Sequence, residues 1–300
     1  MADKKDFQCT YQNSAGISAE VTRGLGLSFP DAYLYHHTMA VLSKALKEYD
    51  GAAFCELPFC HTVEAEAMGG RINYGNEAVG PRAKEYIYTS VEELLELPDI
   101  DFTTGRIHEV LLACRELKDA GEHVVLQISG PFTILNVLID AKYVFKAMRK
   151  RPELMKEVFW KLGEQILRFM KEACEYGVDM IRYADSSGGV NILGPKMAEQ
   201  VVEDFTYEFL KKAGKIVRDK TLILLCPKTT FALIGTGKAR FRDVKLPVPE
   251  NYGKACVQMI GKIRFAGQMC IKNRDYQLKN GIFKAVELIE SFEGGECDEL

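Results

Sequence analysis

Apolar and polar positions follow two different periods along the chain. From about residue 50 onward, short apolar runs rich in β-branched residues alternate with longer segments of helical period. This alternation is typical of β–α–β units built on a parallel sheet. It predicts strands at 52–54, 124–128, 180–183, 222–225 and 263–265, a weaker strand around 244, and helices at 36–49, 106–119, 133–149, 152–176, 195–217, 251–260 and 280–292.

The helix predicted at 152–176 has the clearest signals. Pro152 suits the first helical turn, where a backbone N–H has no partner within the helix. Apolar residues then recur every four positions from Leu154 to Met170, and Gly177 ends the pattern. The sequence therefore predicts one long amphipathic helix here.

Polar or small residues follow four of the predicted strands, at 129–131, 185–189, 226–230 and 267–270. In a (β/α)8 barrel the loops after the strands form the active-site face, so these segments would meet at one mouth. We therefore expect an α/β fold, a (β/α)8 TIM barrel, as a single domain over 31–300 with an N-terminal arm or cap over 1–30. A doubly wound sheet, with its site at a switch point, is the alternative.

Composition narrows the functional classes. The 300 residues, 47% hydrophobic and 27% charged, are ordinary for a globular protein and suffice for one large barrel. A formal net charge of −3 offers no basic surface for phosphates, so nucleic acid is not an expected partner. The polar N-terminus has no signal-peptide pattern and no apolar stretch is long enough for a membrane span, so we expect a cytoplasmic protein.

The nine cysteines indicate reduced thiols rather than disulfides. Their number is odd, their spacing is irregular, and the chain carries no secretion signal. Cys226 and Cys270 each come directly after a predicted strand. Thiolates bind Zn²⁺ strongly, and a catalytic zinc ion needs about three protein ligands and one open position. The two thiols are therefore candidate zinc ligands, and burial as small hydrophobic side chains is the alternative.

Two further segments carry candidate catalytic groups. Tyr183 and Asp185 precede two serines and two glycines, so Asp185 could ligate a metal or hold a substrate group. The alternative is that Asp185 caps or turns the chain into the next helix. Residues 54–69 gather two thiols, the imidazole of His61 and three carboxylates, including Glu64. This cluster could bind a metal or serve acid–base chemistry, but a purely structural role in an amphipathic helix is the favoured interpretation.

An ordered set of motifs resembles a known superfamily. Residues 130–135 (Gly-Pro-Phe-Thr-Ile-Leu), 151–154 (Arg-Pro-Glu-Leu) and 176–185 (Tyr-Gly-Val-Asp-Met-Ile-Arg-Tyr-Ala-Asp) look like the central signature of the uroporphyrinogen-decarboxylase superfamily. Residues 62–69 (Thr-Val-Glu-Ala-Glu-Ala-Met-Gly) are similar to an early segment of its methyltransferase branch. The resemblance spans roughly residues 50–285 and implies a (β/α)8 barrel.

The resemblance also implies one of two activities. Members of the superfamily are metal-free decarboxylases of tetrapyrroles, or zinc enzymes that move a methyl group to or from a corrinoid protein. The decarboxylases resemble one another in an N-terminal Arg-Gln-Ala-Gly-Arg segment that grips substrate carboxylates, whereas residues 22–26 here contain only Arg23. We therefore expect a corrinoid-dependent zinc methyltransferase, with a metal-free decarboxylase and a non-catalytic interaction subunit as the alternatives.

The coenzyme M methyltransferases of this superfamily carry His-x-Cys at one strand end and a second Cys at a later one. The matching residues here are Leu224-Leu225-Cys226 and Cys270, so both thiols are present and Leu224 stands at the histidine position. The resemblance therefore implies zinc on the two thiols with a third ligand from elsewhere. It also favours a relative of the enzymes that demethylate methoxylated aromatics over a coenzyme M enzyme.

The remaining roles follow from the same resemblance. Asp185 is the first candidate for the third zinc ligand, followed by Glu64 and then His61, and the candidate catalytic side chains are Asp185, Tyr183 and His61. The implied cofactors are Zn²⁺ and a corrinoid carried by a partner protein. The implied substrate is a small methylated molecule such as a methoxylated aromatic, and the sequence leaves the direction of transfer open.

Two lysines lie near the candidate zinc ligands. Lys228 and Lys272 each follow one of the two thiols by two residues and could orient an anionic substrate. The favoured interpretation is that both are solvated loop lysines.

Overall fold

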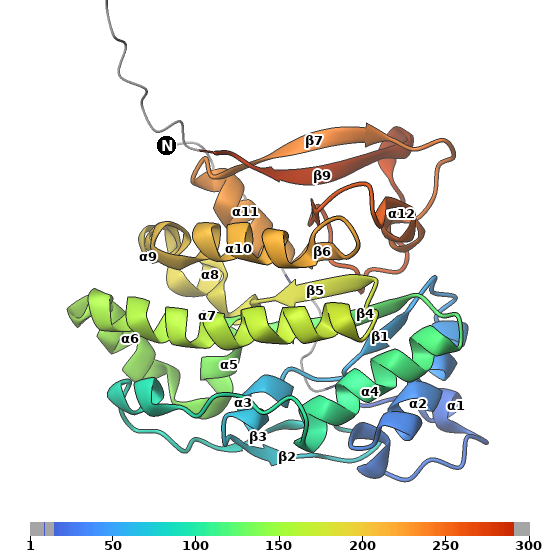
Figure 1. The fold of residues 1–300 in the computed structure, drawn as a ribbon, viewed down its shortest axis with the longest axis horizontal. Helices are drawn as coiled ribbons and strands as arrows, with labels where there is room; N and C mark the ends of the chain where they lie inside the picture. Colours follow the sequence, from blue (N-terminus) through green and yellow to red (C-terminus); the bar gives the residue numbers. More distant parts are fainter. Residues whose placement is uncertain (1–8, 10–14, 291–300) are drawn as a thin grey trace, which may run out of the picture.

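The computed structural model describes Cys9 and residues 15–290, and Figure 1 shows how their helices and strands are arranged. The described chain begins with α1 (Ala19–Thr22), a 3-10 turn and α2 (His36–Tyr49). Val21, Tyr33 and Leu42 pack together in a small apolar cluster, so the described part of the expected arm lies against α2. The rest of that arm lies outside the described residues.

The central sheet has seven strands in the order β1-β4-β5-β6-β8-β9-β7. Five strands are parallel, each paired with the next: β1 (Cys55–Leu57), β4 (Val124–Ser129), β5 (Met180–Ala184), β6 (Leu222–Leu225) and β8 (Phe265–Ala266). The last two strands are antiparallel: β9 (Ile282–Leu288) and β7 (Ala239–Lys245). The fold is α/β with a mostly parallel sheet, as the sequence predicts, and its parallel strands follow chain order as in a (β/α)8 barrel.

Helices cover one face of this sheet. In Figure 1, α4, α7 and α10 run along the parallel strands, which they contact. After α2, the helices of the described residues are α3 (Val63–Ala67), α4 (Gly105–Asp119), α5 (Pro131–Leu138), α6 (Ala141–Lys150), α7 (Pro152–Glu175), α8 (Val190–Leu193), α9 (Pro195–Val201), α10 (Tyr207–Val217), α11 (Pro227–Gly235) and α12 (Tyr252–Met259). A small hairpin of β2 (Arg71–Asn73) and β3 (Arg82–Glu85) lies apart from the main sheet. No helix in this part of the chain has the length and apolar character needed to cross a membrane.

Several predicted elements are confirmed to within one residue, namely the strands at 124–128, 180–183 and 222–225 and the helices at 36–49 and 152–176. The first strand is shifted and begins at Cys55. The helix predicted at 133–149 is two helices, because the Asp140 carboxylate accepts a hydrogen bond from the backbone N–H of Lys142 and so caps a new helix. The segment predicted at 195–217 contains a π-helical turn between α9 and α10.

The helix predicted at 280–292 is wrong for the described part of that range. Residues Ile282–Leu288 form β9, which pairs with β7 along its length. Phe283 and Ala285 are buried at alternate positions, and a short apolar run does not distinguish this period from a helical one. The partner strand, which decides the outcome, lies far earlier in the chain. Residues 291–292 lie outside the described residues.

Alternate residues of the parallel strands face two different cores. Ile181 and Ile223 belong to the large core that includes α4, α7 and α10. The residues that precede them, Met180 and Leu222, point to the opposite face and belong to a second core, together with residues of α12 and β9. We call four of these the apolar layer: Phe54, Val125, Met180 and Leu222. The apolar layer forms the floor beneath the residues described next.

Candidate active site

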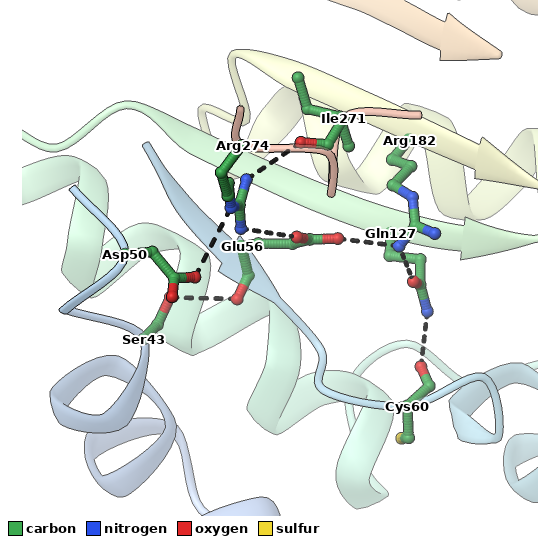
Figure 2. Close-up of polar contacts among 8 residues, drawn as sticks. All are labelled: Ser43, Asp50, Glu56, Cys60, Gln127, Arg182, Ile271 and Arg274. Carbon is green, nitrogen blue, oxygen red and sulfur yellow. Dashed lines mark hydrogen bonds and ion pairs between the residues drawn. The ribbon is translucent and has the colours of Figure 1, made fainter. Parts of the chain in front are cut away.

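A charged layer lies on the same face as the apolar layer, two residues nearer the carboxyl ends of the strands. It consists of Glu56 of β1, Gln127 of β4 and Arg182 of β5 (Figure 2). Arg182 Nη1 donates hydrogen bonds to Glu56 Oε1 at 2.8 Å and to Gln127 Oε1. Gln127 Nε2 in turn donates to the backbone carbonyl of Cys60 at 2.7 Å. Because a buried charge is stable only when it is paired, these contacts fix the guanidinium in place.

Glu56 lies between two guanidinium groups (Figure 2). Arg274, from the segment after β8, places Nη2 3.4 Å from Glu56 Oε2 and Nε 3.5 Å from Asp50 Oδ2. Burial alone would raise the pKa of this glutamate, but the positive charges of Arg182, Lys272 and Arg274 lower it to about 2. Glu56 is therefore ionised at neutral pH and links β1 to two later parts of the chain.

The two candidate zinc thiols follow two strands that pair in parallel, β6 and β8. Cys226 follows β6 as the first residue before α11, and Cys270 follows β8. Burial raises the pKa of the Cys226 thiol to about 11; Cys270 adds to the rise, whereas Arg182 opposes it. Both thiols in turn raise the pKa of Arg182. Because β6 and β8 are paired parallel strands, the two thiols follow neighbouring strand ends.

A third ligand is not preassembled. In residues 15–290 and Cys9, no three His, Cys, Asp or Glu side chains already stand together as a metal-binding group. His61 nevertheless has a buried Nδ1 with no hydrogen-bond partner. Burial, with the charges of Arg182 and Lys272, holds the pKa of His61 well below its ordinary value, so its imidazole is neutral, the form that binds metals. Two thiols and one imidazole nitrogen are donors that suit Zn²⁺.

Asp185 caps a helix. Its Oδ1 accepts hydrogen bonds from the backbone N–H of Thr133 at 2.9 Å and from Thr133 Oγ1 at 3.1 Å, in the first turn of α5. A Cβ atom on Gly130 would lie 2.4 Å from the Cβ of Asp185, so only glycine allows this approach. Burial raises the pKa of Asp185 to about 6, and the Thr133 bonds oppose the rise. The geometry matches the capping alternative, with the cap on α5 rather than on the next helix.

Glu64 is also held by backbone. Its Oε1 accepts a hydrogen bond from the Ser129 N–H at 2.6 Å, which joins α3 to the end of β4. Burial raises the pKa of this carboxyl group, and the Ser129 bond opposes the rise. Like Asp185, Glu64 therefore uses its carboxylate to satisfy a backbone donor.

Tyr183 lies on the opposite face of β5 from Arg182. Its ring packs against Phe209 of α10 with ring centroids 5.2 Å apart, and it is buried in the large core. Successive residues of a strand point to opposite faces. The structure therefore places Tyr183 among the outer helices and does not bring it into the charged layer.

The two lysines beyond the thiols differ from one another. Lys228 is buried, and its Nζ donates to the Ser186 carbonyl and to Asn191 Oδ1, both at 3.1 Å. It is therefore not a solvated loop lysine but a tie between α11 and the segment after β5. Lys272 Nζ makes no hydrogen bond or ion pair with any described residue, although the charges of Glu56 and Cys270 act on it.

Two cavities are relevant to the location of the candidate site. A cavity of about 320 Å³ lies beside the charged layer and is lined by Glu56, Lys272 and Arg274 among others. A larger groove of about 640 Å³ lies between α10 and the β8–β9 edge, on residues such as Lys215 and Glu287. None of the candidate catalytic or metal-binding residues lines either cavity, but the smaller one reaches the charged layer at Glu56, whereas the larger groove does not.

Sequence reasoning missed the charged layer. Strands of a parallel sheet that are buried on both faces read as continuous apolar runs. Arg182 interrupts such a run in Met-Ile-Arg-Tyr-Ala (180–184), and Glu56 stands between Cys55 and Leu57. A charged residue in the middle of an otherwise apolar strand is the signal that identifies this layer.

Comparison with known proteins gives the family. The profile of the family described as "Uroporphyrinogen decarboxylase (URO-D)" matches residues 14–240, more than half of the chain. The chain therefore belongs to the URO-D family, as its motifs predict.

Similar proteins include methyltransferases, matched over most of this chain, and a "Uroporphyrinogen decarboxylase" of Myxococcus xanthus (strain DK1622), 25% identical over 134 residues and covering 42% of this chain and 38% of that protein. The chain is 27% identical over 239 residues to "Methylcobamide:CoM methyltransferase MtaA" of Methanosarcina barkeri (strain Fusaro / DSM 804), covering 79% of this chain and 69% of that protein. It is 23% identical over 219 residues to "Methylcobamide:CoM methyltransferase MtbA" of Methanosarcina mazei, covering 72% and 64%. A solved "methyltransferase from Methanosarcina mazei" superposes with a TM-score of 0.63 at 23% identity, covering 76% and 67%, which supports the fold. The expectation of an enzyme of the methyltransferase branch is confirmed.

Proposed function

We propose that this protein moves a methyl group between a small methylated substrate, such as a methoxylated aromatic, and a corrinoid carried by a partner protein, with Zn²⁺ as the Lewis acid. The proposal is supported by the positions of Cys226 and Cys270 after β6 and β8, which are paired parallel strands in a URO-D family chain. The corrinoid requirement is supported by the methylcobamide relatives. We expect the reaction to take place in the cytoplasm.

The proposed zinc ligands are the two thiols and His61. Asp185 and Glu64 were stronger candidates from the sequence, but each carboxylate already accepts a hydrogen bond from a backbone N–H. Moving either one to a metal would leave that buried donor without a partner, which destabilises the fold by about 1–3 kcal/mol. Nδ1 of His61 has no hydrogen-bond partner within the described part of the chain, so its binding to a metal would leave no other group unpaired. We therefore place His61 ahead of the two carboxylates.

The residues of this chain prepare the site for methyl transfer. The charge of Arg182 opposes the raised pKa of the Cys226 thiol, and Glu56 and Gln127 hold the guanidinium in place. The apolar layer beneath keeps water from the floor of the site. The chemistry that a bound zinc ion supplies is polarisation of the heteroatom that carries the methyl group.

A partner protein needs access to the carboxyl ends of the strands. The segment after β5 leads into α8, where Ile192 is 45% exposed. An exposed apolar side chain at this position suits the rim of a surface that a corrinoid protein would cover. The proposal therefore places the partner over the mouth formed by the loops after β5, β6 and β8.

Metal content tests the ligand set. We expect about one zinc ion per chain in the unaltered protein, and its loss in Cys226→Ser and Cys270→Ser. His61→Ala is expected to weaken zinc binding while cobalt(II) substitution still gives a thiolate charge-transfer band. Cys174→Ser is the matched control, because Cys174 is a half-buried thiol that packs against the large core and contacts Thr221, and its loss should leave zinc content unchanged.

Activity tests the reaction. Purified protein with zinc should transfer methyl groups to a corrinoid protein, and chelation should abolish the transfer. A zinc-free protein whose decarboxylase activity survives chelation would instead support the metal-free alternative.

A further inference from the structure

The cavity of about 320 Å³ beside the charged layer has no role in the zinc proposal. It lies between α2, the carboxyl end of β1 and the segment that follows Cys270. Its apolar walls come from Ile17, Leu46, Phe54, Pro58 and Phe59, and its polar lining comes from Ser43, Lys47, Asp50, Glu56, Lys272 and Arg274. A cavity of this size with a few polar groups is typical of a small-molecule site.

The lining of this cavity carries three cations, Lys47, Lys272 and Arg274, and two carboxylates, Asp50 and Glu56. Lys47 forms an ion pair with Glu122. Arg274 pairs with Asp50 and Glu56. Lys272 is the lining cation without a hydrogen bond or ion pair to any residue that the structure describes.

Glu56 does not supply the missing partner for Lys272. Its Oε1 accepts from Arg182 and its Oε2 faces Arg274, and no hydrogen bond or ion pair joins it to Lys272 in the described structure. An ammonium group withdrawn from bulk water needs a compensating anion or several hydrogen-bond acceptors. The lining therefore has room for one more negative charge.

Lys228 shows that an ammonium group without a hydrogen-bond acceptor is not general for the lysines that follow the two thiols. It occupies the matching position two residues after Cys226, yet its ammonium group is held by two oxygen acceptors. The ammonium group of Lys272, two residues after Cys270, has no such acceptor among the residues that the structure describes. The difference separates a lysine that supports the fold from one that is available to a ligand.

Arg274 is held ready beside Lys272. Its guanidinium lies 4.9 Å from the centroid of the Phe54 ring, and its Nη1 donates to the Ile271 carbonyl at 3.1 Å. Figure 2 shows the side chain fixed between Asp50, Glu56 and this carbonyl. A cation that is already positioned loses little conformational freedom when it binds an anion.

We propose that this cavity binds a small organic anion with an apolar body, such as an aromatic carboxylate, whose anionic group pairs with Lys272 and Arg274. Phe54, Pro58 and Phe59 would contact the apolar body. Lys272 follows Cys270 by two residues, so a short segment of chain joins this cavity to the proposed zinc site, although neither thiol lines the cavity. Identifying this anion as the methylated substrate rests on the proposed function, whereas anion binding itself does not.

Calorimetry with benzoate tests the site on the full chain. Benzoate should bind, and benzamide, which has the same ring without the charge, should bind at least about tenfold more weakly, the change expected when a charge-assisted hydrogen bond is lost. Lys272→Met should weaken benzoate binding by about 10- to 100-fold, and Lys272→Arg should retain most of it. The exposed Lys262, which lines only the larger groove, gives the control Lys262→Met, with no expected change.

The proposal is overturned if benzamide binds as tightly as benzoate, if Lys272→Met has no effect, or if sulfate binds and benzoate does not. Benzoate binding in a chain that neither holds zinc nor transfers methyl groups would retain the anion site and reject the proposed function. Zinc binding and methyl transfer without benzoate binding would reject the anion site alone.

Discussion

The apolar layer and the charged layer come from alternate residues of the same strands, yet they stabilise the fold by different physics. Met180 and Leu222 of the apolar layer remove carbon surface from water, an effect that does not depend on direction. Arg182 and Glu56 of the charged layer are only 11% and 12% exposed, and such charges are stable only while each has its partner within hydrogen-bond distance. Two residues along a strand therefore separate a layer in which apolar side chains can be exchanged from a layer in which each charged side chain requires its partner.

The largest expected effect comes from removing the buried guanidinium. Arg182→Met leaves Glu56 with the more distant Arg274 as its remaining partner, so we expect the free energy of unfolding to fall by about 3–5 kcal/mol. Urea unfolding at pH 7 measures this loss. The control is Arg240→Met, which breaks an exposed pair with Glu287 and should change stability by at most about 1 kcal/mol. Equal losses in the two variants would contradict the distinction between the layers.

A cavity in the apolar layer is expected to have a somewhat smaller effect. Met180→Ala removes a fully buried side chain, so we expect a loss of about 3 kcal/mol in the free energy of unfolding. The reactivity of Cys226 with an alkylating agent should keep its pH profile, because no charge near the thiol changes. In Arg182→Met the same profile should move to higher pH, since the charge that opposes the raised thiol pKa is gone. If both variants shift the profile alike, Arg182 has only a packing role.

The smallest expected effect is a dependence of stability on acid. The pKa of Glu56 is lowered from 4.5 to about 2 in the folded chain, so this group contributes stability above about pH 4.5 and loses it as the pH falls toward 2. Stability measured by urea unfolding should therefore decline over that range, and the decline should be shallower in Glu56→Gln. Comparison of the two proteins cancels Asp185, whose raised pKa acts in the opposite direction. Parallel pH curves for the two proteins would show that Glu56 is not strongly paired.

Much of the fold could be predicted because it follows from neighbours in the sequence. The short apolar run at 180–183 and the four-residue period from Leu154 to Met170 depend only on local residues, and both elements are confirmed. β9 was mistaken for a helix because its short apolar run fits either period until β7 is known to lie beside it. An element can therefore be predicted when the residues that determine its structure are close in sequence, and not when, as for β9, the strand that determines it lies far away along the chain.

The candidate site divides in the same way. The sequence identified Cys226 and Cys270 because both follow strands, and the carboxyl ends of parallel strands meet on one side of the sheet. It could not show that Asp185 caps α5 through Thr133, a contact that joins residues 52 positions apart. The ranking of third ligands depends on such contacts, because a carboxylate already bonded to backbone is no longer free to bind a metal.

The sequence by itself determined the α/β class, the URO-D family, the main parallel strands and the pair of thiols, because local periodicity and motifs are written in adjacent residues. The tertiary structure alone decided which side chains are free and which are already engaged. Arg182 meets Glu56 across 126 positions of sequence, and Lys228 and Lys272 differ only in what the fold places around them. Hydrogen bonds and ion pairs act over a few ångströms, so only the folded chain fixes their partners.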